Sequence, residues 1–216
     1  MSGRGSIVAL AMSSWDRPPA GTTAVDFFER WLPAAFQASG RQAPLAAPVV
    51  RASLSGTGGG AWDVQACEDE LRIEPAGREA PDVWLRQSAT DFLIALSPEP
   101  DPDLPQMLPP GWSALDLLFL DPRDIELLRQ VNGRMLVEVA GRRGRRWTFD
   151  VGFGKTGVSA GRARATIRLD GTTFDGLRNG TIAPMQPLFD GRLKIEGDRA
   201  LAMQLLLLLG SRLARR

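Results

Sequence analysis

Histidine and tyrosine are absent from the 216-residue chain, and cysteine occurs once, as Cys67. The missing histidine removes the commonest general base, and the missing tyrosine removes a frequent acid. Metal sites built on imidazole or on pairs of thiolates are excluded, and so is an intramolecular disulfide. We therefore predict no catalytic residue, no metal and no cofactor, and the lack of a disulfide makes the cytoplasm the expected compartment.

Strong net charge and long apolar runs are also missing. Lys and Arg total 26 against 25 Asp and Glu, so the net charge of +1 gives no overall attraction to nucleic acid or to an anionic membrane. The leucine run at 205–209 is far shorter than the roughly 20 residues that span a bilayer. We therefore expect a soluble protein, in which residues 1–22 form a mobile tail and not a secretory signal.

The chain does contain one α+β pattern that occurs twice. In the first series, a helix capped by Thr23 is followed by strands with period-two alternation at 49–55, 62–66, 71–73 and 83–85, a helix at 88–96, a proline-rich loop at 97–111, a strand at 115–120 and a helix at 121–131. The second series has strands at 135–139, 147–153 and 163–169, a helix at 172–178, a strand at 192–196 and a terminal helix at 198–213.

Several positions of the two series correspond. Trp62 corresponds to Trp147, residues 88–92 to 170–174, and residues 119–123 to 195–199. This repetition predicts a duplicated unit, with a divergent first copy at 23–131 and a second copy at 132–216. The alternative is that two α+β stretches merely share an order of elements.

The second copy carries the sequence Met-Gln-Pro-Leu-Phe-Asp-Gly-Arg-Leu-Lys-Ile-Glu-Gly-Asp-Arg-Ala-Leu-Ala-Met at 185–203. This stretch resembles the late strand and terminal helix of the sterol-carrier-protein lipid-transfer domain. The resemblance extends back through Phe174 and the Trp147 hairpin to about Gly133. The first copy resembles the family more faintly, and it has Phe-Leu-Asp-Pro-Arg at 119–123 where the second copy has its Gly-Asp turn.

The resemblance implies an α+β fold with a mainly antiparallel sheet, covered on one face by helices, and an apolar tunnel between them. The alternating strands agree, because they give one apolar and one charged face. The predicted function is non-catalytic binding and transfer, or presentation, of a sterol, fatty acyl chain or similar lipid. The alternative is an enzyme that uses the same cavity to fold and cyclise or rearrange a hydrophobic substrate such as a polyketide.

The candidate ligand-binding residues are apolar side chains of the second copy, because Met and Phe adapt to irregular apolar shapes. They are Phe174, Met185, Phe189, Ile195, Met203 and Leu207. Ordinary core packing is the alternative for this set. The terminal helix is apolar nearly all round, so it either walls the tunnel or is buried between the copies.

Basic residues gather on the polar sides of the second-copy strands and in the turn at 142–146. Such a patch suits transient contact with the anionic surface of a membrane, although a solvated sheet face explains it better. Nucleic acid is not expected as a partner, because no aromatic residues interleave with these charges. The sequence leaves the oligomeric state open.

Overall fold

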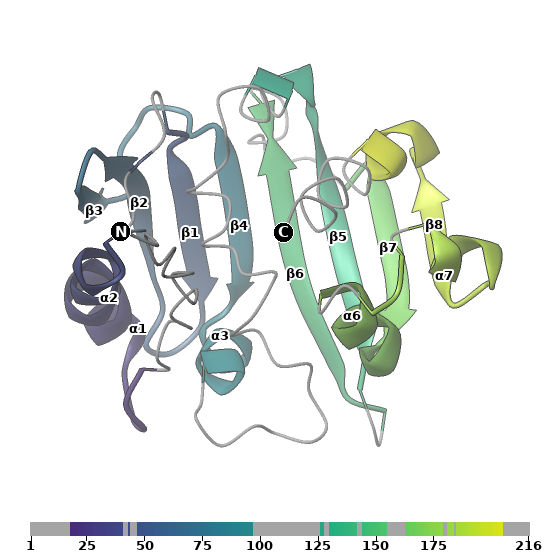
Figure 1. Cartoon of the computed structure of the whole chain (residues 1–216), viewed down its shortest axis with the longest axis horizontal. Helices are drawn as coiled ribbons and strands as arrows, with labels where there is room; N and C mark the ends of the chain where they lie inside the picture. The colour runs from purple at the N-terminus through teal and green to yellow at the C-terminus, as the bar shows by residue number, and fades with distance from the viewer. Residues whose placement is uncertain are drawn as a thin grey trace, which may run out of the picture.

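The computed structural model describes residues 18–40, 43, 47–96, 126–127, 130–141, 144–154, 163–178, 181–183 and 185–204. Its centre is an eight-stranded sheet in the order β3-β2-β1-β4-β6-β5-β7-β8 (Figure 1). The strands are β1 (Val50–Ser55), β2 (Gly60–Cys67), β3 (Glu70–Pro75), β4 (Val83–Ser88), β5 (Gly133–Ala140), β6 (Arg146–Phe153), β7 (Ala165–Asp170) and β8 (Leu193–Gly197).

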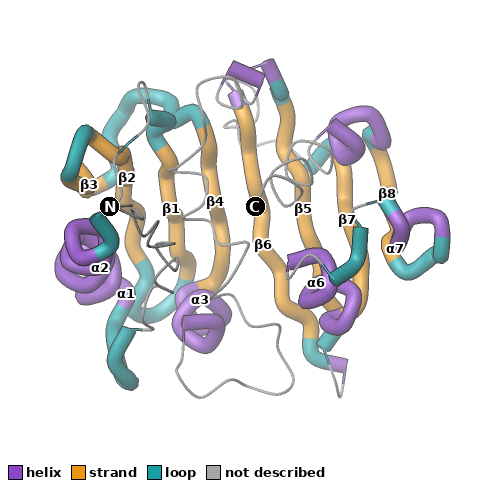
Figure 2. The backbone as a smooth tube through the Cα atoms, viewed as in Figure 1, coloured by secondary structure: helices purple, strands orange, loops and turns teal. Residues whose placement is uncertain are grey.

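The sheet is mixed but mainly antiparallel. Only the pairs β1–β4 and β5–β7 are parallel, and the other neighbouring strands run antiparallel. The helices are α1 (Ala24–Asp26), the π-helical η1 (Phe27–Trp31), α2 (Leu32–Ala38), α3 (Ala89–Leu96), α6 (Gly171–Arg178) and α7 (Gln186–Phe189), arranged as Figure 2 shows. The predicted α+β class is therefore confirmed.

The two faces of the sheet differ as the alternation predicts. Val50, Ala52 and Leu54 of β1 are buried in the core, together with Phe27 and Phe174 from the helices. We call this apolar side the covered face. The opposite side carries ion pairs between neighbouring strands, and we call it the open face.

The N-terminal helix begins at Thr23 as predicted and continues past Pro33. The side chain of Thr23 accepts a hydrogen bond from the backbone N–H of Asp26, which caps the first turn. Pro33 stands at the start of α2, and the wider π-helical turn before it closes through the bond from Leu32 N–H to the carbonyl of Phe27. Pro33 therefore lies inside one continuous helical run, directly after the π-helical turn, and the chain stays helical to Ala38.

The two halves of the sheet share a three-stranded core. In the first half, the hairpin β1–β2 is followed by β4, which runs parallel to β1, and then by α3. In the second half, the hairpin β5–β6 is followed by β7, which runs parallel to β5, and then by α6. Ser88 caps α3 through Asp91 N–H at 3.0 Å, and Asp170 caps α6 through Thr173 N–H at 2.7 Å. The fourth strands differ, since β3 lies outside β2 whereas β8 lies outside β7. Duplication therefore stays a prediction.

The expected match of Trp62 with Trp147 is wrong in register. Trp62 pairs with Ala52, whereas Trp147 pairs with Val139. Val139 is the counterpart of Leu54, because each lies opposite the residue that precedes the helix cap, Leu169 in β7 and Gln87 in β4. Gly60 occupies the equivalent place in the first half. The cause is the longer β5–β6 connection at 141–145, which displaces the tryptophan by two positions while leaving it on the same face. The correspondence of the α3 and α6 caps places Phe92 with Phe174, as predicted.

Candidate functional site

The covered face of the second half has helices on two sides and strands beneath them. Phe174 of α6 contacts Trp147 of β6, with ring centroids 5.7 Å apart. Residues 199–204 continue from β8 as a helix. A Cβ atom on Gly133 would lie 2.7 Å from Cδ2 of Leu201, so this terminal helix packs directly on the beginning of β5.

The Gly-Asp turn of the family motif fixes where the terminal helix begins. Gly197 has φ +81°, and a Cβ atom there would lie 2.2 Å from the carbonyl oxygen of Arg164. The backbone N–H of Asp198 donates to that carbonyl at 2.8 Å. Only glycine combines this conformation with such close approach, so the turn clamps β8 to the strand beside it.

Asp198 acts as the cap of the terminal helix. Its Oδ1 accepts a hydrogen bond from the backbone N–H of Leu201 at 3.0 Å, and its other oxygen pairs with the guanidinium of Arg164. Arg164 also donates to the carbonyl of Asn132 at 2.8 Å. The Leu201 N–H, and after it the Arg164 guanidinium, hold the pKa of Asp198 below its usual value. This network ties the terminal helix to the residues just before β5.

The strands beneath the helices provide an apolar surface that the described residues cover incompletely. Val137, Ile167 and Ile195 are neighbours across β5, β7 and β8. Ile167 is buried, whereas Ile195 is half-buried. Phe149, which pairs with Val137, is half-buried as well.

The predicted ligand-binding residues do not all share one environment. Phe174 is 9 % exposed, and Met185, Ile195 and Met203 are half-buried. Phe189, at the end of α7, is 81 % exposed, so it does not line an enclosed space in this structure. Leu207 lies outside the described residues. Contact between these residues and a ligand stays a prediction.

Trp147 was not among the predicted ligand-binding residues, yet it is the largest fully buried side chain of the described residues. Its ring lies between Phe149, at 4.9 Å, and Phe174. An indole on the apolar side of a strand needs an acceptor for its N–H. This need for an acceptor is the feature of the sequence that could have marked Trp147 as a candidate site residue.

The covered face of the first half is filled with aromatic rings. Phe28 stacks on Trp62 at 4.6 Å and on Phe92 at 5.5 Å, and Phe27 meets Phe92 edge to face at 5.2 Å. Phe27, Phe28 and Trp62 are buried. The N-terminal helix therefore occupies the space over this half of the sheet.

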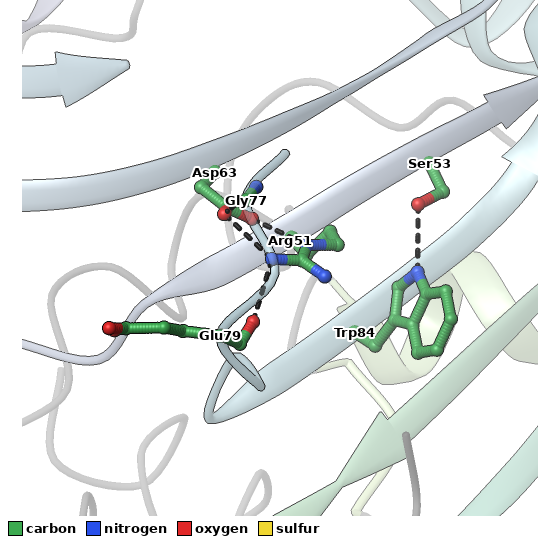
Figure 3. Close-up of polar contacts among 6 residues, drawn as sticks. All are labelled: Arg51, Ser53, Asp63, Gly77, Glu79 and Trp84. Atoms are coloured by element: carbon green, nitrogen blue, oxygen red, sulfur yellow. Dashed lines mark hydrogen bonds and ion pairs between the residues drawn. The ribbon is translucent and has the colours of Figure 1, made fainter. Parts of the chain in front are cut away.

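The open face of the first half is held by paired polar groups (Figure 3). Nε of Arg51 lies 2.6 Å from Asp63, and Nη2 of Arg51 donates to the Glu79 carbonyl at 2.9 Å. Burial alone would raise the pKa of Asp63, but hydrogen bonds from Arg51 and Gly77 lower it below its usual value. Trp84 donates to Ser53 at 2.8 Å. These groups pair with one another across β1, β2 and β4.

Two basic residues of the second half, Arg168 and Arg192, are paired with carboxylates as well. Arg168 contacts Glu138 at 2.5 Å and also Glu196, and Arg192 contacts Asp190 at 2.6 Å. A solvated sheet face, as favoured above, accounts for these contacts. Within the described ranges, no three acidic or cysteine side chains are grouped to hold a metal ion, and no helix is long and apolar enough to cross a membrane.

The described residues thus form an α+β fold, with one apolar sheet face covered by helices and a terminal helix that begins at the Gly197–Asp198 turn. Residues 115–209 match the model of the SCP-2 sterol transfer family. The resemblance predicted from the Gly-Asp motif is thus confirmed over that segment, and the match supports lipid binding or transfer in general. It begins at residue 115, after β1 to β4, so the assignment of 23–131 as a divergent first copy stays a prediction.

Three solved structures are similar to part of the chain. Sterol carrier protein 2 from Yarrowia lipolytica is 22 % identical, with 41 % of this chain and 74 % of that one covered and a TM-score of 0.32. Sterol carrier protein domain 2 of Helicoverpa armigera is 23 % identical over 42 % of this chain and 75 % of that one, with a TM-score of 0.33. Sterol carrier protein 2 like 2 from Aedes aegypti is 19 % identical over 36 % and 74 %, with a TM-score of 0.29. No curated protein matches the chain.

Proposed function

We propose that the chain binds a long apolar molecule, without transforming it, on the covered face of its second half. The ligand lies between α6, the terminal helix and the strands β5 to β8. The observation that carries this proposal is the match of residues 115–209 to the model of the SCP-2 sterol transfer family, which covers β5 to β8. Phe27, Phe28 and Trp62 cluster on the covered face of the first half, and Phe149 and Ile195 are half-buried on the covered face of the second.

Each predicted residue has a place in this proposal. Phe174 and Ile195 form the inner wall from α6 and β8, and Met203 faces them from the terminal helix. Met185 lies just before α7, where a flexible thioether adapts to ligands of different shape. Leu207 would extend the wall further along the chain.

Phe189 has a separate role, because it is 81 % exposed. A large aromatic side chain on the surface suits brief contact with the interface of a membrane. We place the entrance for the ligand at this end of α7. Transfer would then follow from contact, with the ligand passing between the membrane and the covered face.

The binding step is tested by titrating the protein with two fluorescent ligands, a pyrene-labelled fatty acid and a naturally fluorescent sterol. Fluorescence should rise on binding and fall when unlabelled lipid is added. Chromatography of the ligand recovered after long incubation should return it unchanged. The proposal is rejected if neither ligand binds, and the non-catalytic part is rejected if the ligand is recovered as a product.

The role of Phe189 is tested separately by transfer between vesicles. Phe189→Ser should slow the transfer of the pyrene-labelled fatty acid to anionic vesicles without changing its affinity for the protein. Val25→Ser is the matched control, because Val25 is also exposed, at 46 %, but lies in the first half. Equal transfer rates for the two variants would contradict an entrance at α7.

A further inference from the structure

Trp147 buries a hydrogen-bond donor for which the described residues provide no acceptor. Its side chain is fully buried, yet among the described residues its Nε1 has no hydrogen-bond partner. The indole nitrogen is only a donor. Unlike an Asn or Gln amide, the ring cannot be flipped to present an acceptor in its place. An unmade hydrogen bond of this kind costs about 1–3 kcal/mol, so the position calls for an oxygen atom.

Two other indoles of the chain show the ordinary arrangement. The N–H of Trp62 points to Glu29 at 3.3 Å, and that of Trp84 donates to Ser53 at 2.8 Å. Trp62 lies on the covered face like Trp147, so burial on that face does not by itself prevent pairing. The unpaired indole is a property of the second half, where the ligand is proposed to lie.

A second unpaired donor lies on the neighbouring strand. Nε2 of Gln87 in β4 is buried and lacks an acceptor among the described residues. Gln87 pairs with Leu54, which is buried, so its side chain is on the covered face. Trp84 and Arg86 alternate with it and lie on the open face, where they stack on each other at 3.5 Å.

Both donors lie where the two halves of the sheet part. The pairing of β4 with β6 ends at Arg86 and Asp150, although β4 continues to Ser88 and β6 begins at Arg146. Figure 1 shows β4 and β6 as the central neighbours of the sheet. Continuing the register would set Gln87 opposite Phe149, two residues from Trp147. The two donors therefore flank the unpaired end of this junction.

We propose that an oxygen atom of the bound lipid accepts a hydrogen bond from the indole N–H of Trp147, with the amide of Gln87 as a second donor. This inference rests on the proposed function and names the polar end of its ligand. The apolar part then runs from the rings of Phe149 and Phe174 towards Ile195. Both donors are uncharged and buried, and burying an unpaired carboxylate would be costly. The ligand class is a long apolar molecule that ends in a hydroxyl or carbonyl group.

The test compares two probes that differ only in this oxygen, pyrenyldecanol and decylpyrene. Trp147→Phe removes the N–H and keeps an aromatic ring. It should weaken the binding of pyrenyldecanol about 5- to 150-fold, the equivalent of one unmade hydrogen bond, and leave decylpyrene within about twofold. Trp62→Phe is the matched control and should leave both affinities unchanged. The inference is overturned if Trp147→Phe weakens both probes equally or neither.

A measurement on the wild-type protein covers the case in which Trp147→Phe does not fold. The indole resonance of Trp147 in a proton–nitrogen correlation spectrum should move downfield with pyrenyldecanol and much less with decylpyrene. An equal response to the two probes would mean that a water molecule or nothing serves as acceptor, which overturns the inference. If neither probe binds the wild-type protein, the proposed function fails with it, whereas binding without this difference rejects the inference alone.

Discussion

Gly197→Ala should destabilise the protein by distorting the clamp that holds the terminal helix. At φ +81° the new side chain adopts a conformation that costs an L-residue about 1–2 kcal/mol. Its Cβ atom would also meet the Arg164 carbonyl oxygen at 2.2 Å and Cα of Ala165 at 3.5 Å. Both atoms belong to the backbone, so no side-chain rotation relieves the contact. The hydrogen bond from Asp198 N–H to that carbonyl, worth about 1 kcal/mol, would be lost as well.

The sum is a loss of roughly 2–4 kcal/mol, from the conformational cost, the hydrogen bond and the displaced backbone. In urea this corresponds to a midpoint lower by about 1–2 M, for a slope near 2 kcal/mol per M. Lipid affinity should fall too, because the terminal helix walls the proposed site. Both quantities are measured by urea titration and by fluorescence titration of the same preparation.

Gly191→Ala is the matched control, since Gly191 has φ +72° but a Cβ atom there meets nothing within 4 Å. It should cost only the conformational part, about 1–2 kcal/mol. The difference between the two variants therefore isolates the contact with Arg164. If the two substitutions cost the same, the terminal helix is not held by this close approach and the explanation of the Gly-Asp motif is wrong.

Three further predictions concern Met203, Asp198 and Phe28. Met203→Trp should occlude the site and abolish lipid binding with an unchanged urea midpoint, whereas a midpoint lowered by the roughly 1–3 kcal/mol of an overpacked core would show that Met203 is plain core. Because the pKa of Asp198 is lowered in the folded protein, its carboxylate stabilises the fold at pH values above the ordinary carboxyl pKa near 4, and this stabilisation is lost as the pH falls through the lowered pKa. The stability advantage of the wild type over Asp198→Asn should therefore shrink on acidification. An advantage that does not change with pH would contradict this role of Asp198. Phe28→Ala should lower the free energy of unfolding by about 3–5 kcal/mol, because it opens the aromatic cluster of the first half. At temperatures where the variant is folded, its lipid affinity should equal that of the wild type. A loss of affinity would show that the ligand lies in the first half and not in the second.

The strands β1 to β8 were predictable because alternation is a local property, whereas the predicted strand at 115–120 lies outside the described residues. Val50, Ala52 and Leu54 are apolar at every second position, and the structure buries this set on one face. The caps of α3 and α6 were predictable for the same reason, since Ser88 and Asp170 act within their own turn. The family motif also identified the turn at Gly197 before any contact was known.

The register of the repeat was not predictable, because it depends on the length of a hairpin connection. The match of Trp62 with Trp147 compared residue types, whereas the pairing of Trp147 with Val139 depends on where the turn at 141–145 closes. Phe189 shows a similar limit. Its sequence context is apolar, but its exposure of 81 % depends on what packs against a four-residue helix.

The missing acceptor at Trp147 could not be read from the sequence either. A tryptophan in a strand carries one donor wherever it lies, and whether an acceptor reaches it depends on distant elements. For Trp62 the acceptor is Glu29, which is 33 positions earlier in the chain. The helix–sheet packing thus decides which indole is paired, and that packing is long-range.

The most direct test of the central claim is a measurement of which side chains touch the ligand. With methyl-labelled isoleucine, methionine and valine and an unlabelled fatty alcohol, intermolecular nuclear Overhauser effects should connect the ligand chain to the methyl groups of Ile195 and Met203. Val64, buried on the covered face of the first half, should show none. Contacts to Val64 without contacts to Ile195 and Met203 would contradict a binding site in the second half.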